Sequence, residues 1–177
     1  MVTIDRKGAV FLGKQYDEPM FDHLSLKKNF DDQEILMNVK DLCQEQNFAV
    51  LGTDGEGHPY TSLIYFAASE DLKQIAFVTP KETRKFSLLS SNKRVSLLVD
   101  NRSYFPDNLS LIHAVTITGN ASVLRDEADI KQYSSLFLNK HPHLVDFLNA
   151  QSSELILIKP LRFFYVRRFQ EVYQWIP

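Results

Sequence analysis

The chain has 177 residues, of which 44% are hydrophobic and 24% are charged, and its formal net charge at neutral pH is −2. This length and composition are typical of one soluble globular domain, and the charge gives no reason to expect nucleic-acid binding. No run of about eighteen apolar residues suits a membrane span, the start of the chain lacks the pattern of a signal peptide, and the only cysteine, Cys43, excludes an internal disulfide, so we expect a cytoplasmic protein.

Residues 1–30 are only weakly periodic, and Gly8, Gly13 and Pro19 interrupt them. We expect an N-terminal arm that lies across the main domain or across a neighbouring subunit, and the sequence leaves both placements open. Residues 31–177 contain no internal repeat, no low-complexity segment and no linker. We therefore predict a single domain over residues 1–177, in which the arm is followed by one folded unit.

A helix is predicted over residues 32–46, with Asp31 or Asp32 as its N-cap. Its apolar side chains recur at the spacing of one helical face, namely Ile35, Leu36, Val39, Leu42 and Cys43. Because Cys43 belongs to this apolar stripe, we expect its thiol to be buried and structural rather than reactive.

The central stretch is predicted to form a tight antiparallel meander around one short helix. Apolar and β-branched runs bounded by turn residues predict strands over residues 48–53, 59–69, 74–79 and 94–100. The short helix is expected over residues 79–85, with Thr79 as N-cap, Pro80 at the first helical position and Glu82 three residues after the cap. Turns this tight predict a small closed or half-closed barrel.

The rest of the chain predicts further strands and two more helices, and therefore a mainly β, α+β fold. A loop at 101–108 precedes a long strand at 109–124 that Gly119 kinks. Asp126 caps a helix at 126–139, and a short helix follows at 143–151. The last strands are expected at 153–158, 163–168 and 172–176, the first two divided at Pro160. His141 and His143 lack a carboxylate or thiol cluster beside them, so no metal site is expected.

The cations that follow the predicted helix start have two interpretations. A helix N-terminus gathers unpaired N–H groups and a positive dipole, so Thr83, Arg84 and Lys85 suit an anionic phosphate. The same run is also typical of a basic turn that faces water. These residues alone leave both interpretations open.

The catalytic residues are unknown, because none of the usual catalytic motifs occurs. The chain has no Gly-x-Ser-x-Gly and no phosphate-binding loop that ends in Gly-Lys-Ser/Thr. The carboxylates of Asp54, Glu56, Glu70 and Asp71 fall in predicted turns, where solvated turn residues are expected. An enzyme without its own acid, base or nucleophile needs a cofactor for the difficult step.

An ordered set of short motifs resembles the pyridoxamine 5′-phosphate oxidase-like family of flavin-binding split β-barrels. The resemblance extends from about residue 48 to residue 124 and rests on Gly57-His58-Pro59-Tyr60, Leu63-Ile64, Val78-Thr79, Thr83-Arg84-Lys85, Asn92-Lys93-Arg94-Val95-Ser96-Leu97 and Val115-Thr116-Ile117-Thr118-Gly119-Asn120-Ala121. No single motif is diagnostic, but their order and spacing are fairly specific. The resemblance implies an FMN-binding split β-barrel, antiparallel and Greek-key-like, with flanking helices.

The resemblance also implies a homodimer with one FMN in each of two interfacial sites. The flavin ring is expected along Ser62, Leu63, Ile64 and Tyr65, and the phosphate at Thr79, Thr83, Arg84 and Lys85. The partner subunit is expected to contribute the strand that begins near His113 and Ala114. Trp175 is expected either beside the flavin or as an anchor in the core or the dimer contact. The implied chemistry is oxidoreduction with an unknown small-molecule redox partner.

Several residues depart from the pattern of true pyridoxamine phosphate oxidases. Ser62 and Ala114 stand where those enzymes carry a basic residue and a glutamine, and the tail from Phe164 to Trp175 lacks their substrate-binding arginine and histidine. The tail is instead similar to that of the haem-utilisation branch, so a non-enzymatic flavin or haem carrier is the alternative. A binding or interaction module on an empty barrel is a further alternative, and it is favoured if Arg84 and Lys85 face bulk solvent. Arg167 and Arg168, which stand among aromatic residues, either receive an anionic substrate, stack on a ring or form an exposed pair at a strand edge.

Overall fold

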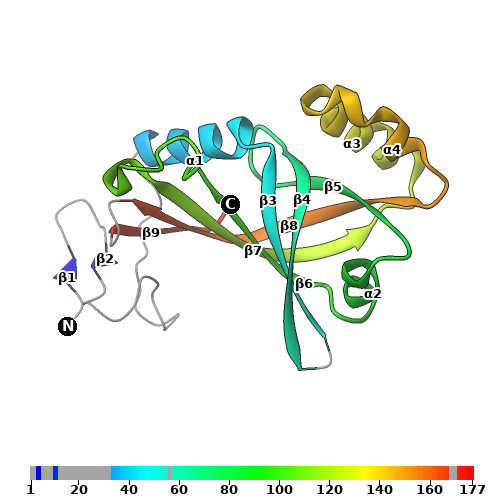
Figure 1. Cartoon of the computed structure of the whole chain (residues 1–177), viewed down its shortest axis with the longest axis horizontal. Helices are drawn as coiled ribbons and strands as arrows, with labels where there is room; N and C mark the ends of the chain where they lie inside the picture. The colour runs from blue at the N-terminus through cyan, green and yellow to red at the C-terminus, as the bar shows by residue number, and fades with distance from the viewer. Residues whose placement is uncertain (1–2, 5–9, 12–32, 56, 168–170) are drawn as a thin grey trace.

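The computed structural model describes residues 3–4, 10–11, 33–55, 57–167 and 171–177 (Figure 1). The helices are α1 (Gln33–Glu45), α2 (Arg84–Ser91), α3 (Glu127–Lys140) and α4 (Val145–Asn149), with short 3₁₀ segments η1 (Leu109–Leu111) and η2 (Pro142–Leu144). The strands are β1 (Thr3–Ile4), β2 (Val10–Phe11), β3 (Phe48–Gly55), β4 (His58–Ala68), β5 (Ile75–Pro80), β6 (Arg94–Asp100), β7 (His113–Val123), β8 (Ser153–Arg167) and β9 (Glu171–Trp175). Across these residues, no helix combines the length and the hydropathy that a membrane crossing requires.

The antiparallel strands close into a barrel with a Greek-key order. β3, β4 and β5 follow one another as a meander, whereas β6 pairs with the other edge of β3. This spatial order, β6-β3-β4-β5, is that of a Greek key. β7 then pairs with β6, and β8 pairs with both β7 and β5, so the ring closes. The predicted α+β fold with an antiparallel split β-barrel is confirmed.

The long strand β8 is the point at which the barrel splits. Its first part, 153–158, pairs with β5, and its last part, 163–167, pairs with β9. β2 then pairs with β9 and β1 with β2, so the described pieces of the N-terminal arm extend this edge of the sheet (Figure 1). The remaining arm, including its Gly8, Gly13 and Pro19, lies outside the described residues, as do the candidate caps Asp31 and Asp32.

The prediction that Pro160 divides two strands is wrong, because a β-bulge accommodates this proline within β8. Thr118 lies opposite Arg162, but Gly119 lies opposite Pro160, so Leu161 is the additional residue on β8. A bulge interrupts the ladder of hydrogen bonds, and the missing N–H of proline is tolerated there. Gly119 is required opposite the bulge because a Cβ atom there would lie only 2.7 Å from the carbonyl oxygen of Lys159.

The barrel core is formed by the inward-facing side chains of the strands together with one face of α1. The predicted helix and its apolar face are confirmed, since Ile35, Val39, Leu42 and Cys43 are buried within the main core cluster. Burial raises the pKa of the Cys43 thiol to about 12. The thiol is therefore protonated at neutral pH, as expected of a structural cysteine.

A second apolar cluster joins α3 to the outer side of β5 and β8. Tyr133 and Phe137 of α3 pack there against side chains that include Val78 and Leu157, beside α4 (Figure 1). The predicted N-cap of α3 is confirmed, because the carboxylate of Asp126 accepts from the backbone N–H groups of Ala128 and Asp129. The short helix predicted at 143–151 corresponds to η2 and α4.

The strand predicted at 109–124 begins later, at His113, and η1 precedes it. The Asn101 side chain holds the intervening loop in this form. Its Oδ1 accepts from the backbone N–H of His113 (2.7 Å), and its Nδ2 donates to the carbonyl oxygen of Leu111 (3.4 Å). The predicted start was wrong because this side chain satisfies backbone groups that strand pairing would otherwise use.

Lys140, at the end of α3, connects that helix to the C-terminus of α1. Its Nζ donates to the carbonyl oxygens of Cys43 (2.8 Å) and Gln46 (2.7 Å) and lies 4.0 Å from the centre of the Phe66 ring. A cation suits a helix C-terminus, where carbonyl groups lack partners. Even so, burial lowers the pKa of the Lys140 ammonium to about 8.

Replacing Lys140 with Met is expected to change how stability depends on pH. The native lysine has a pKa of about 8, against 10.5 ordinarily, so between these values the unfolded chain binds more protons than the native one. The wild-type free energy of unfolding should therefore rise with pH across this window, relative to Lys140→Met, by on the order of 1–3 kcal/mol. Urea unfolding of both proteins at about pH 7.5 and about pH 10 measures this. If the free energies of unfolding of the two proteins differ by the same amount at both pH values, the expected effect of Lys140 is contradicted.

Candidate cofactor site at the start of α2

The connection from β5 to α2 holds the residues predicted to bind phosphate, but the helix begins later than the sequence suggested. α2 starts at Arg84, and Thr83 is its N-cap, whereas Thr79 and Pro80 belong to β5. The prediction of Thr79 as N-cap was wrong because β5 continues to pair with β8, with Thr79 opposite Glu154 and Pro80 opposite Ser153. Strand pairing here prevails over the local capping signal.

The two threonine hydroxyls fix the shape of this connection. The Thr83 hydroxyl donates to the carbonyl oxygen of Pro80 (2.9 Å) and accepts from the backbone N–H of Phe86 (3.4 Å). Since its only proton is used, Thr79 is the donor in the 3.1 Å contact between the two hydroxyls. Thr79 is fully buried. Both threonines therefore hold the first turn of α2 in place against β5.

Arg84 and Lys85 form a cationic site at this helix start. The Arg84 side chain is exposed, and its guanidinium lies 5.3 Å from the centre of the Tyr60 ring. Lys85 is half-buried, and burial lowers the pKa of its ammonium. In the described parts of the chain, no carboxylate lies within ion-pair distance of either cation. The dipole of α2 adds positive potential at the same place, so the arrangement suits an anion.

β4 adds an open strand edge and an unpaired hydroxyl. β4 pairs with β3 from His58 to Tyr65, but it pairs with β5 only from Phe66 to Ala68, so one edge of its first part has no strand partner among the described residues. The Oγ of Ser62 is buried and has no hydrogen-bond partner in the same set of residues. The open backbone edge of β4 and the unpaired hydroxyl of Ser62 can both form hydrogen bonds to the polar edge of a bound aromatic ring.

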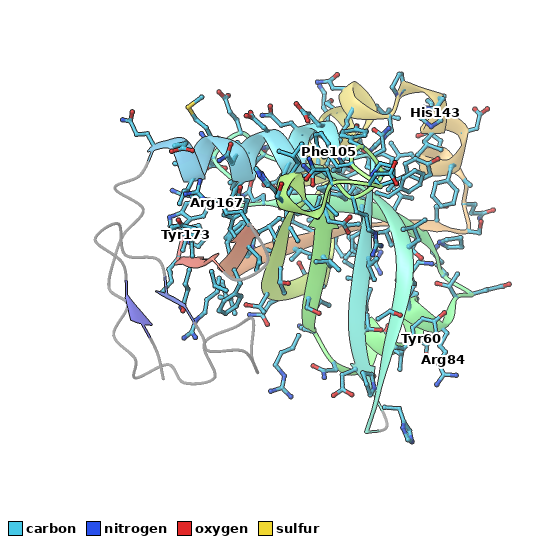
Figure 2. The ribbon with its side chains drawn as sticks, turned by 60° about the vertical axis from the view of Figure 1, so that its left-hand side comes forward. Tyr60, Arg84, Phe105, His143, Arg167 and Tyr173 are labelled. Atoms are coloured by element: carbon cyan, nitrogen blue, oxygen red, sulfur yellow. The ribbon has the colours of Figure 1, made fainter. Side chains whose placement is uncertain are left out.

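Figure 2 shows the Tyr60 and Arg84 side chains beside one another, near the start of β4 and of α2. Along β4, Ile64 is buried in the core, while Leu63 points outward and is 63% exposed. Tyr65 also faces outward, against Phe48, with 4.3 Å between the ring centres. One chain thus brings Thr79, Thr83, Arg84 and Lys85 close to the strand that carries Ser62, Leu63, Ile64 and Tyr65.

The other predicted site residues lie at a different end of the same chain. His113 and Ala114 begin β7, and Trp175 ends β9. The β9 strand lies toward the left of Figure 1, whereas α2 lies toward the right. The Nδ1 of His113 lies 2.8 Å from the Tyr165 hydroxyl, and the Trp175 ring lies 4.8 Å from that of Phe163. Trp175 packs against the main core here, and its predicted flavin contact stays a prediction.

Arg167 is buried and has partners within the chain, so it is not part of an exposed pair. It is 8% exposed, and its guanidinium donates to the Glu34 carboxylate (3.2 Å) and to the Tyr173 hydroxyl (2.9 Å) (Figure 2). The interpretation as an exposed strand-edge pair is wrong for Arg167, because its inward register on β8 directs it to α1 and β9. The interpretation that it stacks on a ring is confirmed, since its Cζ lies 5.2 Å from the centre of the Tyr173 ring. Arg168 lies outside the described residues.

His141 has a structural role that the sequence did not reveal. Its ring is fully buried, and its Nε2 lies 2.8 Å from the carbonyl oxygen of Phe66. A carbonyl only accepts, so Nε2 carries the proton, and burial lowers the pKa of the ring. No group of three or more His, Cys, Asp or Glu side chains in the described ranges is arranged to hold a metal ion. His141 therefore ties α3 to β4.

Comparison with known proteins identifies the family. The family model described as pyridoxamine 5′-phosphate oxidase matches residues 35–176. No curated protein matches the chain. Among solved structures, a haem-binding protein from Mycobacterium smegmatis has a TM-score of 0.67 at 14% identity, and the match covers 77% of this chain but only 56% of that one.

Two further solved structures have the same fold. A protein from Clostridium acetobutylicum, described as related to general stress protein 26 and of the pyridoxinephosphate oxidase family, matches with a TM-score of 0.65 at 17% identity, over 82% of this chain and 96% of that one. A FAD-binding protein from Mesorhizobium loti matches with a TM-score of 0.58 at 16% identity, over 73% and 91%. Identities this low show a shared fold alone. Since the family model spans residues 35–176, the chain belongs to the pyridoxamine 5′-phosphate oxidase-like family.

Proposed function

We propose that the chain is a flavoprotein that binds FMN between the first part of β4 and the start of α2, and that it exchanges hydride or electrons with a small molecule. The observation that carries the proposal is the cationic helix start, where Arg84 and Lys85 meet no carboxylate of the described chain. The FAD-binding relative from Mesorhizobium loti supports a flavin within this family. We further propose a cytoplasmic location, which suits the single buried and unpaired cysteine, Cys43.

The residues present fit the two ends of FMN. Arg84, Lys85 and the first N–H groups of α2 would hold the phosphate, and Thr79 and Thr83 keep that turn in shape. The unpaired edge of β4 and the buried Ser62 hydroxyl would hydrogen-bond to the polar edge of the ring. When bound, the flavin supplies the redox chemistry. The side chains of this site bind and orient the cofactor.

We propose that a second copy of the chain completes the site. A lateral row of side chains, apolar apart from Thr116, crosses the outward face of β4, β3, β6, β7 and β8. Its members belong to neither core cluster, and they are Leu63, Val50, Leu98, Thr116 and Phe164. Leu63 belongs both to this row and to the proposed flavin strand, so a copy packed here would lie beside the open edge of β4. In this homodimer, His113, Ala114 and Trp175 would approach the site of the other subunit.

One alternative function has a specific observation in its favour. The Mycobacterium smegmatis relative is a haem-binding protein, and the tail of this chain is similar to that of the haem-utilisation branch. A carrier of flavin or haem would bind its cofactor without turnover. The cationic helix start favours FMN over haem as the ligand, because it matches a phosphate directly.

The absorption spectrum of the purified protein, recorded together with its sedimentation, tests the proposal. We expect the near-ultraviolet and blue bands of a flavin, at one flavin per chain, in a species that sediments as a dimer. A single intense Soret band after addition of haem, with no flavin retained, would favour the haem carrier. A monomer that holds stoichiometric FMN would overturn the shared site, and a protein that binds neither cofactor would overturn both functions.

A further inference from the structure

We propose that Tyr60 is a positioning residue that holds the Arg84 guanidinium ready for an anionic phosphate. This inference rests on the proposed FMN site and adds a residue for which no role in the site was predicted. Tyr60 lies on β4 two residues before Ser62, and side chains alternate along a strand, so Tyr60 shares the face of Ser62 and Ile64. On this side of β4, the centre of the Tyr60 ring lies 5.3 Å from Cζ of Arg84.

The two partners differ in how firmly they are held. Tyr60 stands in a paired strand opposite Thr53, whose buried hydroxyl donates to the carbonyl oxygen of Tyr60 (3.2 Å). Arg84 opens α2, and its long side chain is exposed. A free arginine loses considerable rotamer entropy when it binds a ligand. A fixed aromatic ring beneath the guanidinium removes part of that entropy before the ligand arrives, and so raises affinity by preorganisation.

An aromatic ring suits this task better than a carboxylate. A carboxylate would also hold Arg84, but it would occupy the N–H donors and neutralise the charge that a phosphate needs. A ring attracts the guanidinium through its π-face and leaves the N–H donors at the guanidinium edge available. The described chain shows this combination, with Tyr60 beside Arg84 and no carboxylate within ion-pair distance. The contact between Tyr60 and Arg84 therefore orients the guanidinium and leaves its N–H donors available for an external anion.

The affinities of Tyr60→Leu and Tyr60→Phe for FMN and riboflavin, measured by quenching of flavin fluorescence, test the inference. Loss of the ring should weaken FMN binding by about three- to tenfold, the range expected for a cation–π contact at a partly exposed site. Riboflavin affinity should stay unchanged, because riboflavin lacks the phosphate. Tyr60→Phe keeps the ring and should restore wild-type FMN affinity. Tyr104→Leu is the control, since Tyr104 is an exposed tyrosine in the loop after β6, whereas Tyr60 is half-buried on β4.

A double-mutant cycle separates positioning from a general structural effect. If Tyr60 acts through Arg84, Tyr60→Leu should have no further effect on FMN affinity in an Arg84→Ala background. An equal loss in both backgrounds, or a loss of riboflavin affinity equal to that of FMN, would overturn the inference while leaving the FMN site intact.

A nuclear magnetic resonance experiment on the full chain tests the contact without any flavin. The ring should shift the Arg84 Nε–H proton upfield, and this shift should disappear in Tyr60→Leu and persist in Tyr60→Phe. Titration with inorganic pyrophosphate should then move the same resonance less steeply in Tyr60→Leu. A protein that binds no FMN but shows both effects would defeat the proposed function alone. An Arg84 resonance that is insensitive to Tyr60→Leu would defeat the inference whatever FMN does.

Discussion

Replacing Arg84 with Ala is expected to weaken FMN binding by about ten- to a hundredfold, because it removes a charge-assisted contact to phosphate of roughly 1.5–3 kcal/mol. Arg84 is suited to this contact by its position. It is the first residue of α2, where the helix dipole already favours an anion, and no carboxylate of the described chain neutralises it. Flavin fluorescence titrations of the wild-type and variant proteins measure the loss.

The comparison with riboflavin shows whether Arg84 acts on the phosphate. Riboflavin should bind the wild-type protein weakly and lose little further in Arg84→Ala. Arg102→Ala is a matched control, because Arg102 is also exposed but already pairs with Asp100 (3.2 Å), and it should leave both affinities unchanged. If Arg84→Ala weakens both flavins equally, Arg84 acts through folding and the phosphate assignment is lost.

The strands of the barrel could be predicted because burial on one face imposes a period of two on the sequence. β3 shows this in Ala49, Leu51 and Thr53, which are buried between more exposed neighbours. The turn after β3 could also be predicted, because Gly57 adopts a positive φ of 76°, which favours glycine. Local signals of this kind depend on residues that are neighbours along the chain.

The errors arose where a distant segment decided the outcome. Thr79 and Pro80 carry a good local capping signal, but β8 pairs with them from more than seventy residues away and extends β5. Pro160 looks like a strand breaker, yet Gly119 on β7 leaves room for a bulge. The sequence around Arg167 is compatible with an exposed cation, but the fold places Glu34 of α1 within ion-pair distance of it. Long-range pairing and burial override local preference in each of these places.

The candidate site was predicted only as far as the order of motifs allowed. Thr83, Arg84 and Lys85 could be placed because the resemblance supplies their role, and the structure sets them close to the start of β4. Tyr60 was missed as a site residue because its contact with Arg84 joins two elements that local pattern does not connect. His113 and Ala114 belong to β7 and Trp175 to β9, whereas the predicted phosphate residues lie around the start of α2, so the roles of the first three depend on the proposed partner subunit.

The final prediction is that the protein loaded with FMN does not oxidise pyridoxamine phosphate at a useful rate, although it belongs to the family named for that reaction. Much of the rate of such an enzyme comes from holding the substrate, through its phosphate, in place beside the flavin. Ser62 stands where the resembled oxidases have a basic residue. Arg167, in the tail that would bind substrate, is buried, with its guanidinium bound to Glu34 and Tyr173.

Oxygen consumption and formation of the aldehyde product, measured with free FMN as the control, test this prediction. Because Ser62 carries no charge and the guanidinium of Arg167 is bound to Glu34 and Tyr173, neither residue can position the substrate phosphate, and both rates should stay at the level of free FMN. Reduction of the bound flavin by dithionite or by a nicotinamide cofactor should still proceed, because it requires only access to the ring, and this separates a missing substrate site from an inert cofactor. Steady oxidation of pyridoxamine phosphate, with oxygen consumed in proportion, would contradict this prediction. It would show that other residues bind the substrate and that the protein acts in vitamin B6 metabolism.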